Sequence, residues 1–94
     1  MSGLPLSRTV RITNRRGLHA RASAKFVTLA SGLKATIMVR KDGYDQEVVG
    51  TSIMGLMMLG AAMGDNITIS ANGDGAQEAL TAIADLVEAR FGEE

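Results

Sequence analysis

The alternation of polar and apolar residues in NITISA, residues 66–71, is the feature that most constrains the fold of this chain. A period of two places Ile67, Ile69 and Ala71 on one face of a β-strand and polar side chains on the other. Such a strand suits an antiparallel sheet that is solvated on one side, because strands of parallel sheets are apolar on both faces. The sequence therefore favours a sheet with one covered face and one open face.

Three further segments are short and at least half polar, as strands of such a sheet should be. Residues 6–12 form the first, although Arg8 interrupts its alternation, and residues 34–40 form the second. The third, about 45–49, is expected to pair back on the second after Asp42-Gly43, because glycine tolerates the positive φ of a tight hairpin turn. The residues expected to face the core are Leu6, Val10 and Ile12 in the first strand, and Ala35, Ile37 and Val39 in the second.

Three other segments carry apolar residues at helical spacing. The first helix is expected from Ala20 to the Ser31-Gly32 stop, and the second from the Thr51-Ser52 cap signal to Gly64-Asp65. The third is expected from Asp74 or Gly75 to about Arg90. The expected buried residues are Ala22, Phe26, Leu29 and Ala30 in the first helix, and Ala76, Leu80, Ile83, Val87 and Phe91 in the third.

The order β-α-β-β-α-β-α predicts the α+β class: a four-stranded antiparallel sheet covered on one face by three helices, an open-faced sandwich. The 94 residues suffice for one domain, residues 1–94. Without cysteine, disulfides and thiolate metal sites are excluded. No apolar run approaches the ~18 residues of a membrane span and no signal peptide opens the chain, so a cytoplasmic protein with no membrane contact is expected.

The zero net charge hides an asymmetry between the two halves of the chain. All ten acids lie in residues 42–94, with Arg90 as the only base there. An anionic partner of the basic half would explain this pattern, and so would mutual neutralisation of the two halves across the fold. The nine other bases are Arg8, Arg11, Arg15, Arg16, Arg21, Lys25, Lys34, Arg40 and Lys41.

His19, the single histidine, stands where the first helix is expected to begin. An N-cap position would place it beside free backbone N–H groups, which attract anions and disfavour a protonated ring. Arg15, Arg16 and Arg21 could bind phosphate oxygens. From spacing alone, His19 could be a helix cap, part of an anion site or a phosphoacceptor. A metal site is excluded, since there is no second histidine or cysteine and no acid in residues 1–41.

Two motifs resemble HPr, the phosphocarrier family of the phosphoenolpyruvate phosphotransferase system. They are Gly17-Leu18-His19-Ala20-Arg21 and, at the expected distance, residues 52–59, SIMGLMML. The resemblance implies an open-faced β-sandwich without a cofactor. It also implies that His19 accepts a phosphoryl group at Nδ1 from phosphorylated enzyme I and passes it to an enzyme IIA protein. Such a protein is a stoichiometric carrier rather than an enzyme with turnover. Arg21 would lie beside the phosphate, with Gly17, Arg16, Ala20 and Ala22 in supporting positions.

The sequence departs from the family at Ala22, where proline usually follows the arginine. Alanine should preserve the helix, so the substitution affects preorganisation of the loop and the transfer rate. Ser52 is expected to cap the second helix, and in many family members the serine at this position is phosphorylated by an HPr kinase. The basic residue often found before that serine is absent in Gly50-Thr51.

The second helix is apolar nearly all round, so part of it should be exposed and available for docking. Ile53, Met54 and Met57 are the expected docking residues. The run 57–62, MMLGAA, looks more like carriers of the nitrogen-related branch than of the sugar branch.

Two other functions compete with the phosphocarrier. One is an HPr-like regulatory module that binds a protein through the methionine-rich helix without phosphorylation, against which the retained His19 argues. The other is a nucleic-acid binder, which zero net charge, the acidic second half and the lack of an aromatic platform disfavour. A monomer is expected for a shuttle.

Overall fold

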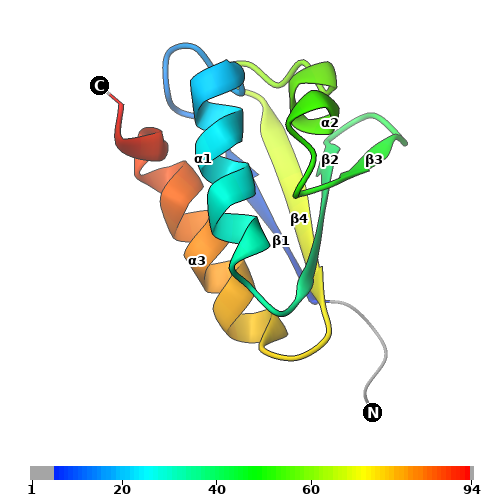
Figure 1. Cartoon of the computed structure of the whole chain (residues 1–94). Helices are drawn as coiled ribbons and strands as arrows, with labels where there is room; N and C mark the ends of the chain where they lie inside the picture. Colours follow the sequence, from blue (N-terminus) through cyan, green and yellow to red (C-terminus); the bar gives the residue numbers. More distant parts are fainter. Residues whose placement is uncertain (1–5, 94) are drawn as a thin grey trace.

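The computed structural model describes residues 6–93, and its order of elements is the one that the sequence predicts (Figure 1). A single 3₁₀ turn follows the third helix. The elements are β1 (Leu6–Arg11), α1 (Ala20–Ser31), β2 (Thr36–Lys41), β3 (Glu47–Val49), α2 (Ile53–Met58), β4 (Asn66–Asn72), α3 (Ala76–Glu88) and the 3₁₀ turn Arg90–Gly92.

The four strands form one antiparallel sheet in the order β1-β4-β2-β3. β4 is central and contributes the cleanest alternation, with Ile67, Ile69 and Ala71 buried. Its neighbours set Val10 opposite Ile67 and Val39 opposite Ile69, so apolar side chains from three strands meet on one face. The predicted fold class is confirmed, including the single covered face.

The opposite face of the sheet is polar. The Thr68 hydroxyl lies 2.8 Å from the Thr9 hydroxyl on β1 and donates to Asp42 Oδ1 at 2.7 Å, so polar side chains bridge strands there. Arg8, which interrupts the alternation of β1, lies opposite Ile69 and reaches Glu88 of α3 at 3.4 Å. Arg8 therefore interrupts the apolar alternation of β1 because it forms an ion pair with Glu88 at the edge between the sheet and α3.

The three helices lie on one side of the sheet, with α1 between α2 and α3 (Figure 1). Phe26 of α1 is fully buried, and Leu80, Ile83 and Val87 of α3 are almost completely buried, as their helical spacing predicts. Leu29 and Ala76 are only partly buried and pack on the rim of the core. Leu6 lies on the covered face as predicted, opposite the buried Ala71, but it remains 41% exposed at the start of edge strand β1.

Four predicted boundaries are wrong by two residues or more. β2 begins at Thr36 rather than at residue 34. β3 begins at Glu47 rather than 45, because the turn after Lys41 is wider than a two-residue hairpin. α2 ends at Met58 rather than near Gly64, since Gly60 takes a left-handed φ of 66° after a tight last turn. α3 ends at Glu88, and Arg90 and Phe91 adopt left-handed φ angles of 59° and 55°.

Candidate phosphoacceptor site

His19 is the N-cap of α1, with extended backbone angles and Ala20 as the first helical residue. Its Nδ1 accepts a hydrogen bond from the Arg21 backbone N–H at 3.3 Å. Its carbonyl accepts the first helical bond, from the Ser23 N–H at 2.9 Å. The imidazole thus lies at the positive end of the α1 dipole, where an anion bound at Nδ1 is stabilised.

The histidine loop and the segment after the second motif, residues 61–65, meet in space through backbone contacts. Leu18 N–H donates to the Ala61 carbonyl at 3.0 Å, and Gly64 N–H donates to the Ile12 carbonyl at 2.8 Å. Gly17 has φ 64°, and a Cβ there would lie only 2.4 Å from Ala61 O. The early end of α2 makes this contact possible, because residues 61–65 leave the helix and pack against the histidine loop.

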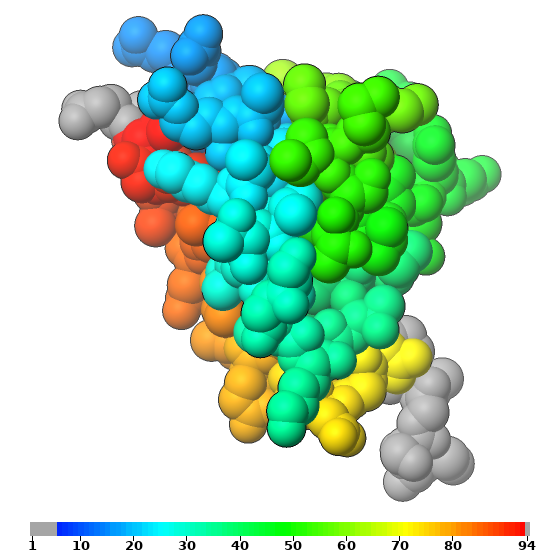
Figure 2. All heavy atoms as spheres, viewed as in Figure 1, coloured from blue at the N-terminus to red at the C-terminus, as the bar shows by residue number. Residues whose placement is uncertain are grey.

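An open pocket of about 740 Å³ lies beside His19. It is bounded by cations from the loop and from α1, and by the C-terminal segment; in Figure 2 the start of α1 and the C-terminal turn lie side by side on the molecular surface. Four cations against one carboxylate make it suited to a small anion such as a phosphoryl group. The lining residues are Arg15, Arg16, His19, Arg21, Lys25, Gly92 and Glu93.

Glu93 is the site residue that sequence reasoning missed. Its Oε2 lies 2.7 Å from His19 Nε2, and its Oε1 accepts from Asn14 Nδ2 at 3.0 Å. The Asn14 bond is the main cause of a lowered Glu93 pKa, and the contact with His19 lowers it further against the opposing effect of burial. No local pattern pairs positions 19 and 93, and Asn14 reads as an ordinary loop residue, so the sequence carried no signal for this contact.

The C-terminal turn holds Glu93 in place. Phe91 is buried to 1% exposure, and its carbonyl accepts from Lys25 Nζ at 2.7 Å. Left-handed φ angles at Arg90 and Phe91 reverse the chain after α3 and direct it towards the start of α1. Such angles in residues other than glycine cost about 1–3 kcal/mol each, so other contacts must maintain them.

The other predicted supporting residues surround the same helix start. Arg16, Ala20 and Arg21 are exposed, whereas Ala22 is fully buried in the first turn. The Ala22 N–H finds no hydrogen-bond acceptor among residues 6–93, as expected for a first-turn amide. Ser23 Oγ donates to the Leu18 carbonyl at 3.1 Å and fastens the loop to the helix.

Ser52 is the N-cap of α2, and its Oγ accepts from the Gly55 N–H at 2.9 Å. Only Leu56 of this helix is fully buried. Five apolar residues in α2 and in the segment after it remain exposed, and we call them the methionine patch; Figure 2 shows α2 beside α1 on one face of the molecule. The methionine patch consists of Ile53, Met54, Met57, Met58 and Met63.

The methionine patch is broader than the sequence predicts. Met58, which was not among the expected docking residues, is 70% exposed, as is Met54. The short α2 leaves both side chains in solvent, because Leu56 is the only residue of this helix that is buried.

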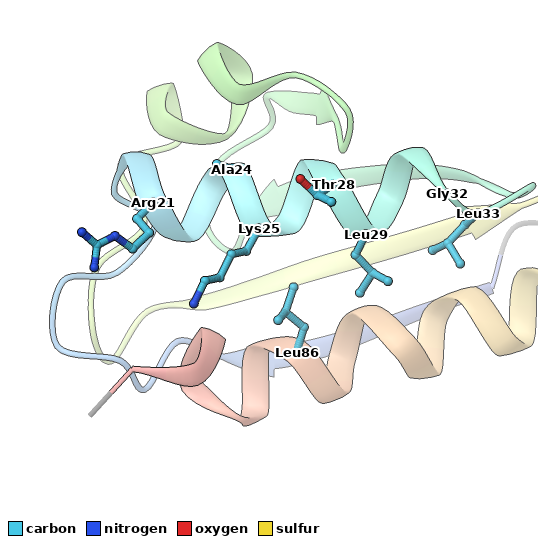
Figure 3. A pocket seen from close by; sticks show the side chains of 8 residues that line it. All are labelled: Arg21, Ala24, Lys25, Thr28, Leu29, Gly32, Leu33 and Leu86. Atoms are coloured by element: carbon cyan, nitrogen blue, oxygen red, sulfur yellow. The ribbon is translucent and has the colours of Figure 1, made fainter.

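A second, apolar hollow of about 640 Å³ runs between α1 and α3 (Figure 3). Arg21 and Lys25 lie at one end, and Leu29 and Leu86 approach each other from the two helices. His19 does not line this hollow, but Arg21 and Lys25 line both the hollow and the pocket beside the ring, so the hollow extends the surface next to the site.

Within residues 6–93, no group of three or more His, Cys, Asp or Glu side chains could hold a metal ion. In the same part of the chain, no helix has the length and apolar character needed to span a membrane.

Comparison with known proteins decides the family. Residues 6–89 match the family model described as PTS HPr component phosphorylation site. The chain belongs to the HPr family of phosphocarrier proteins. It is 47% identical over 88 residues to phosphocarrier protein HPr of Neisseria meningitidis serogroup A, covering 94% of this chain and 97% of the relative. It is 42% identical to phosphocarrier protein NPr of Shewanella violacea, covering 94% of each chain.

The fold of an HPr from Thermoanaerobacter tengcongensis agrees, with a TM-score of 0.87 at 45% identity over 95% of this chain and 98% of that structure. The predicted family and the coarse function, a carrier of the phosphotransferase system, are thereby confirmed.

Proposed function

We propose that His19 accepts a phosphoryl group at Nδ1 from phosphorylated enzyme I and passes it to an enzyme IIA protein. The observation that carries this proposal is the position of His19 as N-cap at the mouth of a pocket lined by four cations. Nδ1 there needs a lone pair to attack phosphorus, and it already acts as a hydrogen-bond acceptor from the Arg21 N–H.

The transfer exchanges one N–P bond for another. The Nδ1 lone pair of His19 attacks phosphorus in line, and the bonding pair of the donor N–P bond returns to the donor imidazole. Charge on the three phosphoryl oxygens is stabilised by the Arg21 N–H, the dipole of α1 and the cationic side chains around the pocket. No proton has to move on His19, so the reverse step, delivery to the acceptor, uses the same geometry.

Incubation with enzyme I and phosphoenolpyruvate tests the proposal. We expect one acid-labile, base-stable phosphate per chain in the native protein and none in His19→Ala. Replacement of Arg21 by alanine should slow transfer but still allow labelling. Equal labelling of His19→Ala, or no labelling of the native chain, would show that the proposal is wrong.

The methionine patch is proposed as the docking surface for both partners. It lies beside the site, because α1 packs on α2 and the segment after α2 contacts the histidine loop. Methionine side chains adapt to different partner surfaces, which suits a carrier that must bind a donor and an acceptor in turn. Ile53, Met54 and Met57 remain the proposed contacts, and Met58 joins them on account of its exposure.

Ser52 is proposed as a site of regulatory phosphorylation by an HPr kinase. Its hydroxyl lies at the start of α2, next to the methionine patch, so a phosphate would add negative charge to the docking surface without unfolding the helix. HPr kinase with ATP should give an acid-stable phosphoserine in the native chain and in His19→Ala, but none in Ser52→Ala. Labelling of Ser52→Ala would end this proposal.

A second candidate is the module that binds a protein partner through the methionine patch without phosphorylation. The exposure of five apolar side chains in α2 and in the segment after it favours this candidate. A pull-down with His19→Ala separates the two functions: partners of the module are retained, whereas partners selective for the phosphorylated carrier are lost. The chain is similar to relatives named HPr, at 47% identity, and NPr, at 42% identity, so parallel transfer assays with sugar-type and nitrogen-type enzyme IIA acceptors would decide the branch.

A further inference from the structure

The two ring nitrogens of His19 face groups of opposite hydrogen-bonding character. Nδ1 lies 3.3 Å from a backbone N–H, which can only donate, so Nδ1 must carry a lone pair. Nε2 lies 2.7 Å from Oε2 of Glu93, and an ionised carboxylate can only accept, so Nε2 must carry the proton. The surroundings therefore select one of the two neutral tautomers, the one that leaves Nδ1 free to attack.

We propose that Glu93 is a positioning residue that holds the His19 ring in its Nε2–H tautomer and orientation, with Asn14 as the group that orients Glu93. Asn14 is fully buried and uses its amide hydrogens on two acceptors, the Gly17 carbonyl at 2.9 Å and Glu93 Oε1 at 3.0 Å. Asn14 Oδ1 is the one buried side-chain polar atom in residues 6–93 without a partner. Because Asn14 Oδ1 has no partner, the orientation of the Asn14 amide is set by the two hydrogen bonds that its Nδ2 donates. These bonds connect the histidine loop, through the Gly17 carbonyl, to the Glu93 carboxylate.

The contact between His19 and Glu93 is supported by buried neighbouring groups. Both side chains are shielded from solvent, His19 at 21% and Glu93 at 17% exposure. The buried ring of Phe91 and the bond from Lys25 to the Phe91 carbonyl anchor the turn two residues before Glu93. The charged groups facing the ring, Arg15, Arg16, Arg21 and Lys25, outnumber this carboxylate, so the pocket still attracts a phosphoryl group.

The arrangement has a consequence for the transfer step proposed above, and this consequence rests on the proposed function. When Nδ1 gains phosphorus while Nε2 keeps its hydrogen, the ring becomes positively charged. The Glu93 carboxylate compensates this charge through the same Nε2–H bond, as a carboxylate does for the imidazolium of a hydrolytic triad. Glu93 contacts the ring and not the phosphoryl group, so it affects the rate of transfer rather than the docking of the partners.

Nitrogen-15 NMR of the ring tests the tautomer without any partner protein. His19 is the only histidine, so one pair of ring nitrogen signals is observed. At about pH 9, above the usual range of histidine titration, the native chain should show an unprotonated Nδ1 and a protonated Nε2. Glu93→Ala should move both signals towards the average of two exchanging tautomers, and Glu93→Gln should act in the same direction, since an amide can either accept or donate. Glu88→Ala, which removes an exposed carboxylate at Arg8, is the matched control and should leave both signals unchanged.

Phosphotransfer from enzyme I supplies the second measurement. Glu93→Ala should lower the maximal rate about tenfold at an unchanged KM, the effect of losing roughly one charge-assisted hydrogen bond. The inference would be overturned if the nitrogen-15 signals of the His19 ring in both Glu93 variants matched those of the native chain. It would also be overturned if Glu93→Ala changed the KM without changing the maximal rate. Failure of the native chain to accept phosphate would overturn the proposed function instead, and the NMR result would still decide the role of Glu93.

Discussion

Replacement of Gly17 by alanine should loosen the junction between the histidine loop and the segment that follows α2. The new Cβ would lie 2.4 Å from Ala61 O and 2.8 Å from the Ala62 Cα, both of them backbone atoms that cannot move aside as a side-chain end would. Gly17 also has φ 64°, a conformation that costs an alanine about 1–2 kcal/mol. Overpacking adds about 1–3 kcal/mol, so we expect a total loss of about 2–5 kcal/mol in the free energy of unfolding.

Gly60→Ala is a matched control for this substitution. Gly60 has almost the same φ, 66°, but a Cβ there would meet nothing within 4 Å. It should therefore lose only the conformational part, about 1–2 kcal/mol. The difference between the two variants isolates the contact of Gly17 with residues 61 and 62.

Urea unfolding followed by circular dichroism measures both variants. With a slope of about 1 kcal/mol per molar urea, the midpoints of the two variants should differ by about 1–3 M. Transfer from enzyme I should slow in Gly17→Ala, because the displaced loop carries His19, and should change little in Gly60→Ala. Equal losses of stability would refute the reasoning, since they would mean that the Ala61 contact adds nothing to the glycine's conformational role.

Three further changes have definite expected outcomes. Ala22→Pro should stabilise the protein by about 0.4–1 kcal/mol in the same urea assay, because the Ala22 N–H has no acceptor among the described residues and a proline restricts the unfolded chain; a loss of stability would mean that the buried site rejects the ring. Acidification should destabilise the native chain: the pKa of Glu93 is lowered from 4.5, mainly by Asn14, so its stabilisation is complete above about pH 4.5 and is lost as the pH falls through the folded value. Glu93→Gln should flatten this pH dependence, and an unchanged curve would contradict it. Met54→Asp should raise the KM for enzyme I about tenfold, which is the effect of losing a moderate interface contact, and should leave the urea midpoint unchanged. An unchanged KM would show that Met54 is not part of the docking surface.

The sheet and the order of elements could be predicted because each strand carries its own signal. The alternation in residues 66–71 requires one polar face, and short strands with that pattern restrict the fold to a covered antiparallel sheet. Arg8 breaks the local pattern of β1 because its role depends on a distant element, Glu88 of α3. The early end of α2 at Met58 is a different kind of failure, because the residue that ends it, Gly60, is local, but the apolar run that continues to Met63 favoured a longer helix.

The site could be predicted only where its residues lie together in sequence. His19, Gly17 and Arg21 share five residues, and their helix-start chemistry is visible there. Glu93 lies on a segment that reaches the ring only because two left-handed residues turn the chain after α3. Such angles in Arg90 and Phe91 follow from packing of the Phe91 ring and from Lys25, which no local pattern encodes.

The absence of proline at position 22 can be judged from what holds the histidine loop. A proline would rigidify the first turn of α1, but three other connections already fix its approach: Leu18 N–H to Ala61 O, Ser23 Oγ to Leu18 O, and Gly17 packed on residues 61 and 62. These connections involve the backbone on at least one side, so they do not depend on the side chain at position 22. The loop should therefore keep its geometry with alanine at position 22. The loss of stability relative to proline should come only from the greater conformational entropy of the unfolded chain.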